Sequence, residues 1–316
     1  MRIHFTPYLI SAVVLLASCS PDSTDSPEIP DEGTTTPISF GVSTIPLEAA
    51  GNGRGPTISY PSDITSLRLF APLWVDNGNG YEFEYYEIED EIVSKNDDMS
   101  WSTSTPYYWP GKDKALSFFA YAPLDIEGWE TASLPHTHPD QIRFFYTPPS
   151  EAENQHDIVF AYDNQILNYT DSPEKKVYLS FSHILANVRF VINGDPTSVY
   201  SISLKWLYGE SGFNPNGHYW DYRNKDNTAQ AMQTSYTVLV PENGVMGDDQ
   251  TLMIIPQQPT PEDASIIVQL RDGTILKNSF AYQSLMSGAI TTININLPKE
   301  GSTPQLTSQL TIASTR

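Results

Sequence analysis

Short runs in which apolar and polar residues alternate recur along the chain from Ile38 onward. Ile38, Phe40 and Val42 alternate with small or polar neighbours, which is the period of a half-buried β-strand. Residues 116–122 are apolar almost throughout and predict a strand covered on both faces. The pattern therefore predicts an all-β fold. Further strands are expected at residues 66–73, 81–92, 142–146, 177–192, 202–208, 236–240, 252–255, 265–271, 274–282 and 293–297.

Two local signals and one polar stretch refine this prediction. The apolar residues of 81–92 change parity at Tyr85, which predicts a β-bulge there. Asp272-Gly273 lies between two expected strands and is a hairpin signal. Many short strands separated by turns indicate β-sandwiches, and the polar residues 169–174 are the natural break between two of them. We therefore expect one sandwich domain over residues 38–172 and a second over residues 173–316.

The first eighteen residues have the features of a secretion signal. Arg2 supplies a positive charge, and the apolar residues 9–17 are too few to cross a bilayer of about 30 Å as a helix. The apolar stretch ends in Leu-Ala-Ser-Cys, which resembles a lipobox, so we expect removal of residues 1–18 and lipidation of Cys19. An ordinary secretion signal with an unrelated cysteine is the alternative. Residues 19–37, rich in Ser, Thr, Pro, Asp and Glu, predict a flexible tether.

Charge and motifs exclude several classes of function. The formal net charge is −21, and loss of Arg2 with the signal makes it −22. Nucleic acid binding requires clustered Lys and Arg, which this chain lacks. An anionic membrane face would repel the chain, so the lipid must anchor it. There is no Gly-rich phosphate loop, nucleophile elbow or His-Glu-x-x-His motif, so we expect neither enzyme activity nor a cofactor.

Candidate metal ligands have simpler interpretations. His136 and His138 have the spacing of ligands on one strand face, but a solvated loop is the simpler interpretation of two histidines beside a proline. His183 is in phase with apolar neighbours and is expected at the edge of the core, hydrogen-bonded locally. The acidic residues between 82 and 91 could offer oxygen ligands to calcium, yet their alternation with aromatic residues is typical of the solvent face of a strand. We therefore predict no metal site.

Several segments, in this order, resemble the fimbrillin family. They are Trp101 with Tyr107-Tyr108-Trp109-Pro110, and residues 116–123, 157–161, 177–186 and 252–257. Fimbrillins are outer-surface lipoproteins of anaerobic Gram-negative bacteria. The resemblance covers residues 38 to 300 approximately and implies two β-sandwich domains of transthyretin-like character. It also implies polymerisation into type V pili that serve cell adhesion and biofilm formation, with an outer-membrane precursor that ends in a fimbrium on the cell surface.

The resemblance implies a processing site as well. In fimbrillins a trypsin-like protease cuts after a basic residue in the loop that follows the first strand. Arg54 is the only Lys or Arg between Arg2 and Arg68, and it lies in Gly-Asn-Gly-Arg-Gly. Cleavage there would release lipidated Cys19 together with the strand that carries Ile38, Phe40 and Val42, and would leave an apolar groove with unpaired backbone groups. The alternative is that Arg54 is simply a turn residue.

The C-terminal segment could fill such a groove. Leu306, Ser308, Leu310 and Ile312 fall on one face, behind a hinge-like segment at residues 298–304. We expect this tail to enter the emptied groove of another fimbrial subunit by donor-strand addition. The alternative is that the tail is the last strand of its own sandwich.

A rival function belongs to a different class. An uncleaved, monomeric, lipid-anchored glycan-binding protein could use Trp206, Tyr219 and Trp220 as a binding face, with residues 212–227 as its centre. A glycan or protein of a host or bacterial surface is therefore a further candidate partner. Early cleavage after Arg54 followed by multimers would favour the pilus, and a protease-resistant monomer that binds polysaccharide would favour the rival.

Overall fold

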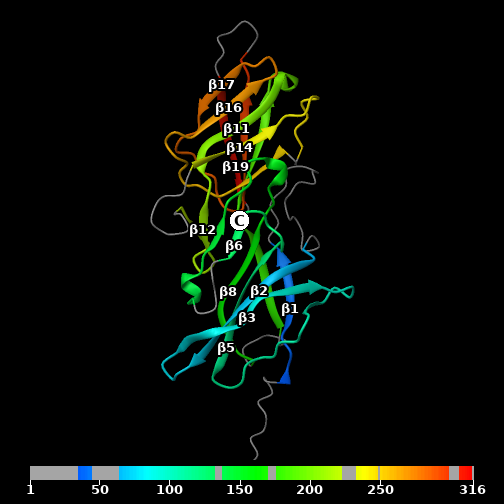
Figure 1. The fold of residues 1–316 in the computed structure, drawn as a ribbon, viewed down its shortest axis with the longest axis vertical. Coiled ribbons are helices and arrows are strands. Elements are labelled where there is room, and N and C mark those ends of the chain that lie inside the picture. The colour runs from blue at the N-terminus through cyan, green and yellow to red at the C-terminus, as the bar shows by residue number, and fades with distance from the viewer. Residues whose placement is uncertain are drawn as a thin grey trace, which may run out of the picture.

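The fold is all-β, as the sequence predicts. The computed structural model describes residues 35–44, 64–131, 137–169, 176–222, 233–247, 250–298 and 306–314. Within these ranges the chain consists of strands joined by turns and a few short 3-10 segments. None of the helices found there is long and apolar enough to cross a membrane. The molecule is elongated, with a barrel in the lower half of Figure 1 and a sandwich in the upper half.

Seven strands of the N-terminal half form a closed barrel. Its neighbours in order are β1 (Ser39–Thr44), β4 (Trp101–Thr103), β3 (Tyr81–Lys95), β2 (Ser66–Asp76), β5 (Lys114–Ala122), β8 (Val159–Leu167) and β9 (Lys176–His183). The expected N-terminal sandwich is therefore joined along its edges, because β1 pairs with β4 on one side and with β9 on the other.

Strand β5 is buried on both faces, as its continuous apolar run predicts. Leu116 and Phe118 point into the barrel core, whereas Phe119 and Tyr121 join a second cluster outside the barrel. The bulge predicted in β3 is also present. The β2–β3 register slips where Leu73 pairs with Tyr85 and the next residue of β2 pairs with Phe83.

Eight strands of the C-terminal half form a β-sandwich. One sheet has the order β15 (Leu252–Ile254), β10 (Ala186–Asn193), β18 (Ala289–Asn296) and β19 (Thr307–Ser314). The other has the order β14 (Gln233–Leu239), β11 (Val199–Tyr208), β16 (Ser265–Leu270) and β17 (Ile275–Ser279). Apolar residues from both sheets fill one core between them. The predicted hairpin joins β16 to β17, with Gly273 at a φ of +91°, a conformation that favours glycine.

A third sheet connects barrel and sandwich. It has the order β13 (Tyr219–Asp221), β12 (Ser211–Asn214), β7 (Phe144–Tyr146) and β6 (Trp129–Thr131). It packs on an apolar cluster, here called the joint cluster, which combines barrel residues with residues of the C-terminal half. Its buried members are Phe70, Tyr86, Phe119, Tyr121, Ile142, Phe144, Tyr146, Ile158, Phe160, Ile184, Leu185, Phe213, Trp220, Met253 and Ile255.

Two sequence predictions about the middle of the chain are wrong. The single strand expected at residues 177–192 is two strands, because Ile184 and Leu185 leave the barrel wall and are buried in the joint cluster. β9 belongs to the barrel, so a domain boundary at residue 172 would separate β9 from the other six strands of the barrel. The chain passes from barrel to sandwich at Ile184 and Leu185 instead.

Candidate assembly site

The backbone of β1 is hydrogen-bonded on both edges. It runs parallel to β9, with six register pairs from Ser39 and Lys176 to Thr44 and Phe181. On the other edge Phe40 pairs with Trp101, and the amide of Ile38 donates to the carbonyl of Tyr107 at 2.8 Å. β1 therefore occupies a slot between two strands, which we call the β1 slot.

The apolar side chains of β1 and of Ile38, which directly precedes it, are part of the barrel core. Ile38 is 9% exposed and Phe40 3% exposed, and Val42 packs against the same cluster. The ring of Phe40 meets that of Phe118 edge to face, with 6.3 Å between centroids. Burial of each such side chain contributes roughly 1.5–3 kcal/mol. The alternating strand predicted here is therefore confirmed, and loss of β1 would expose a substantial part of the core.

A tyrosine borders the β1 slot at its N-terminal end. The hydroxyl of Tyr107 donates to Glu91 at 3.3 Å. Burial, and then the charge of this carboxylate, raise the pKa of Tyr107. Tyr107 is therefore a neutral donor at ordinary pH, while its carbonyl accepts from Ile38.

The C-terminal strand lies in its own sandwich. β19 pairs with β18 at eight positions, where Leu310 is opposite Ile293 and Ile312 is opposite Thr291. Leu306 is 2% exposed and belongs to the sandwich core. Among the described strands β19 has one partner only, because it stands at the end of its sheet. This is the arrangement that the alternative interpretation of the tail predicts, and a donor role for Leu306, Leu310 and Ile312 stays a prediction.

The other assembly residues lie outside the described part of the chain. Cys19 belongs to the undescribed residues 1–34, and Arg54 to the undescribed residues 45–63 that connect β1 to the rest of the barrel. Lipidation at Cys19 and cleavage after Arg54 stay predictions.

The candidate metal ligands that the structure describes do not gather into a site. His136 is outside the described residues, whereas His138 accepts a hydrogen bond from the Asp140 amide and packs on Trp74. The acidic residues of β3 lie mostly on its exposed face, and Asp90 pairs with Arg68 at 3.2 Å. No group of three or more His, Cys, Asp or Glu that could hold a metal occurs in the described ranges.

The structure contains a buried histidine–aspartate pair, of which the sequence predicts only the histidine. His183 is buried and its Nδ1 lies 2.7 Å from Oδ2 of Asp157. The two residues are far apart in sequence, and each directly precedes a residue of the joint cluster, Ile184 and Ile158 respectively. The sequence predicts a locally bonded histidine but does not identify its partner.

The aromatic residues proposed as a glycan-binding face do not form one. Trp220 is 9% exposed and its indole N–H donates to the carbonyl of Ile184 at 2.8 Å. Tyr219 accepts a hydrogen bond from Arg143, whose guanidinium lies 5.8 Å from the ring centre. Trp206 is exposed, on β11 of the sandwich. The prediction is wrong for Trp220, which packs in the joint cluster, whereas Tyr219 and Trp206 are exposed.

Comparisons with known proteins agree with this architecture. A family model described as fimbrillin-like matches residues 57–314, whereas no curated protein matches the chain. A fimbrial protein from Bacteroides vulgatus has a similar structure, with a TM-score of 0.54 and 12% identity over 88% of this chain and 99% of that one. A proposed cell adhesion protein from Bacteroides uniformis has a TM-score of 0.55 and 12% identity, over 89% and 99% of the two chains. A proposed cell adhesion protein from Bacteroides ovatus has a TM-score of 0.54 and 15% identity, over 88% of this chain and 97% of that one.

Proposed function

This chain belongs to the fimbrillin-like family and is a fimbrial subunit of the cell surface, and from that premise we propose how it is made and assembled. It is exported as a precursor anchored in the outer membrane by lipid on Cys19. A trypsin-like protease cuts after Arg54, β1 leaves its slot, and the C-terminal strand of another subunit replaces it. The resulting fimbriae serve cell adhesion and biofilm formation.

The observation that carries this proposal is the position of β1. It is paired on both edges and buried in the barrel core, yet its C-terminal end is joined to β2 only through residues 45–63, which contain Arg54. A cut in that connection would leave β1 attached to the barrel by non-covalent contacts alone. Its departure would leave both β4 and β9 with unpaired backbone groups, an arrangement that favours uptake of another strand.

The same geometry gives a reason for β19 to move. In its own sandwich β19 has one partner, β18, whereas in the β1 slot of a neighbour it would have two. Leu306, Leu310 and Ile312 would be buried there. Each would stabilise the assembled form by ~1.5–3 kcal/mol, or roughly 5–9 kcal/mol together before backbone pairing is counted. Loss of the single β18 ladder and of the Leu306 contacts opposes the exchange. The second ladder in the new position favours it.

Limited proteolysis tests this function. We expect trypsin to cut the wild-type precursor first after Arg54 and multimers to follow. Arg54→Gln should remain uncut and monomeric, whereas Lys277→Gln, at an exposed residue of β17, should behave like the wild type. A precursor that multimerises equally well with Arg54→Gln would contradict processing at this residue.

A truncation separates cleavage from exchange. Removal of residues 306–316 should leave the early cut after Arg54 intact but abolish multimers, since no donor strand is present. Mixing truncated with full-length subunits should cap the chains and shorten them. Multimers of unchanged length from the truncated protein alone would contradict donation by this tail.

A further inference from the structure

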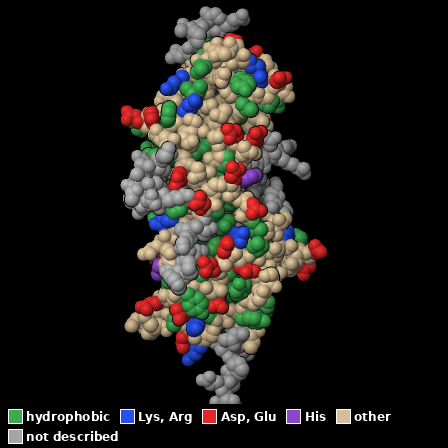
Figure 2. Space-filling view, in the orientation of Figure 1, with side chains coloured by type: hydrophobic (Ala, Val, Ile, Leu, Met, Phe, Trp, Pro, Cys, Tyr) green, Lys and Arg blue, Asp and Glu red, His purple; other side chains and the backbone are tan. Residues whose placement is uncertain are grey.

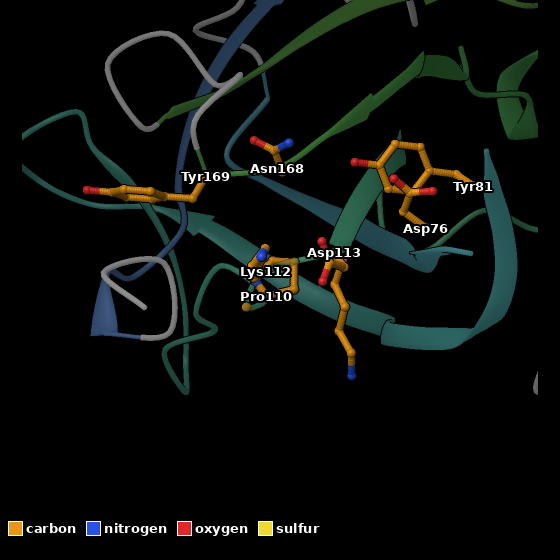
Figure 3. Close-up of a pocket in the computed structure, with 9 residues that line it drawn as sticks. Asp76, Tyr81, Pro110, Lys112, Asp113, Asn168 and Tyr169 are labelled. Carbon is orange, nitrogen blue, oxygen red and sulfur yellow. The ribbon is translucent and has the colours of Figure 1, made fainter. Parts of the chain in front are cut away.

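A cavity of about 400 Å³ opens at the end of the barrel opposite the sandwich. β5 starts there at Lys114 and β8 ends there at Leu167, whereas their other ends, Ala122 and Val159, pair beside the joint cluster. Figure 3 shows the lining residues grouped around the opening, with Tyr81 and Asp76 on one side and Tyr169 on the other. Asn168 lies between them, opposite Pro110 and Asp113.

Backbone hydrogen bonds hold this lining in place. The amide of Asp76 donates to the carbonyl of Asp113 at 2.8 Å, and that of Lys114 donates to Gly111 at 3.2 Å. The Asp76 carboxylate also accepts from the amide of Gly78 at 2.8 Å. The cavity is therefore formed before any ligand arrives, as is usual for small-molecule sites of this volume.

A second hollow of about 330 Å³ adjoins the first. The two share Pro110, Gly111 and Lys114, so they flank one segment of chain. Tyr85 and Tyr108 line the second hollow and are 39% and 46% exposed. Each hollow thus has tyrosine rings beside the shared segment that contains Pro110 and Gly111. This arrangement suits an extended ligand with repeating units.

The lining selects a class of ligand. Asp76 and Asp113 balance Lys112 and Lys114 in formal charge, so the first cavity favours neither an anion nor a cation. Tyrosine and proline provide apolar surfaces, while carboxylate, amide and ammonium groups provide hydrogen-bond acceptors and donors. A ligand that matches both has an apolar face and several hydroxyl groups. Acidic side chains spread over the face shown in Figure 2 and the net charge of −21 disfavour an acidic ligand.

We propose that these two hollows bind a neutral oligosaccharide. The sugar rings stack on Tyr81 in the first hollow and on Tyr108 in the second, and their hydroxyls bond to Asp76 and Asn168. The second hollow adjoins the β1 slot, because Tyr107 and Tyr108, which line it, pair with Ile38 and Pro37. The site is therefore tested on the uncleaved precursor, in which β1 is in place.

Saturation-transfer NMR on the purified full chain tests this site. The probes are cellobiose, lactose, maltotriose, mannotriose and xylotriose, with 3′-sialyllactose as an acidic comparison. We expect at least one neutral probe to receive saturation at its ring protons and to bind more tightly than 3′-sialyllactose. Tyr81→Ala and Asn168→Ala should each weaken that binding by about tenfold, the loss that follows removal of a central contact.

Tyr200→Ala is the control, because Tyr200 is 46% exposed, as is Tyr108 of the second hollow, but lies on β11 of the sandwich. It should bind the probes as the wild type does, and thermal melting verifies that each variant is folded. Absence of binding by every neutral probe would overturn the proposal, as would preference for 3′-sialyllactose. Undiminished binding by folded Tyr81→Ala and Asn168→Ala variants would overturn it too.

Discussion

β1 and β19, the first and last strands of the described chain, have six and eight residues and similar alternating sequences, but they differ in how many strands they pair with. β1 has a strand on each edge and carries buried residues of the barrel core. β19 stands at the end of its sheet and pairs with β18 alone. A barrel cannot lose a wall strand without leaving two open edges, whereas the sandwich without β19 keeps its sheet order and gains one new edge at β18. Loss of β1 would therefore favour uptake of another strand by the barrel, whereas release of β19 would cost the sandwich one ladder, as the proposed exchange requires.

The largest effect is expected at Phe40. Phe40→Ala should destabilise the precursor by about 3–5 kcal/mol, because it removes a buried ring and leaves a cavity beside Phe118. Denaturant unfolding of the uncleaved precursor measures this. Fimbriae assembled from processed subunits should show no such loss, since β1 is no longer present. Equal destabilisation of both forms would mean that β1 stays in its slot.

A smaller effect is expected at Leu306. Leu306→Ala should cost about 2–3 kcal/mol, because the side chain is buried in the sandwich but lies beside an edge strand, where the structure can relax. The same denaturant series measures the difference from Phe40→Ala. Gln309→Ala, at an exposed position of β19, is the control and should be near neutral. A loss at Leu306 larger than that at Phe40 would reverse the comparison.

Loss of the buried His183–Asp157 pair beside the joint cluster should lower the free energy of unfolding by about 2 kcal/mol. His183 ends β9, the barrel strand that pairs with β1, and its Nδ1 lies 2.7 Å from Oδ2 of Asp157. Asp157→Ala leaves a buried imidazole nitrogen without this hydrogen bond, which typically costs ~1–3 kcal/mol. Thermal unfolding at pH 7 measures the loss, and a double-mutant cycle with His183→Gln isolates the interaction. A coupling free energy near zero would show that the pair does not hold the joint.

The smallest effect is an alkaline weakening of the same joint. Burial raises the pKa of Tyr222 to about 12, and its hydroxyl donates to the carbonyl of Pro256. Because the folded pKa exceeds that of the unfolded chain, near 10, this stabilisation is complete below pH 10 and is lost as the pH rises to about 12. We expect a contribution of about 1–2 kcal/mol, since the side chain is partly exposed.

Tyr222→Phe removes this titration and is the test of its origin. Unfolding free energies measured from pH 9 to pH 12 should fall less steeply in the variant than in the wild type. An identical slope in both proteins would assign the alkaline loss to other buried tyrosines, such as Tyr162, whose pKa burial also raises to about 12.

Local features of the fold could be predicted from the sequence. The alternation of Ile38, Phe40 and Val42 predicts β1, and the parity change at Tyr85 predicts the bulge of β3. The continuous run of β5 predicts a strand covered on both faces. Each of these follows from side-chain period and neighbouring residues, which a single sequence contains.

Long-range features could not be predicted in the same way. Ile184 falls out of phase with Val177, Leu179 and Phe181. That change of parity does not reveal that Ile184 and Leu185 leave the barrel for the joint cluster. Trp220 lies in a segment whose composition suits a binding face. Its burial and its hydrogen bond to the carbonyl of Ile184 show that it is part of the core instead. The partner of His183 is likewise set by tertiary packing. β1 closes the barrel through a parallel pairing with β9. The two strands are far apart in sequence, so no hairpin signal predicts this pairing.

The most direct test of strand exchange is to fasten β1 in its slot. Ser43 and Ser180 are register partners on β1 and β9 with 3.4 Å between their hydroxyl oxygens, and the natural chain has no cysteine besides Cys19. A disulfide in Ser43→Cys/Ser180→Cys would tether β1 without blocking Arg54. After trypsin treatment the oxidised variant should stay monomeric, and reductant should restore multimers, while Ser43→Cys alone multimerises throughout. Multimers of equal length from the oxidised variant would contradict the account, because the slot would still be filled by its own β1.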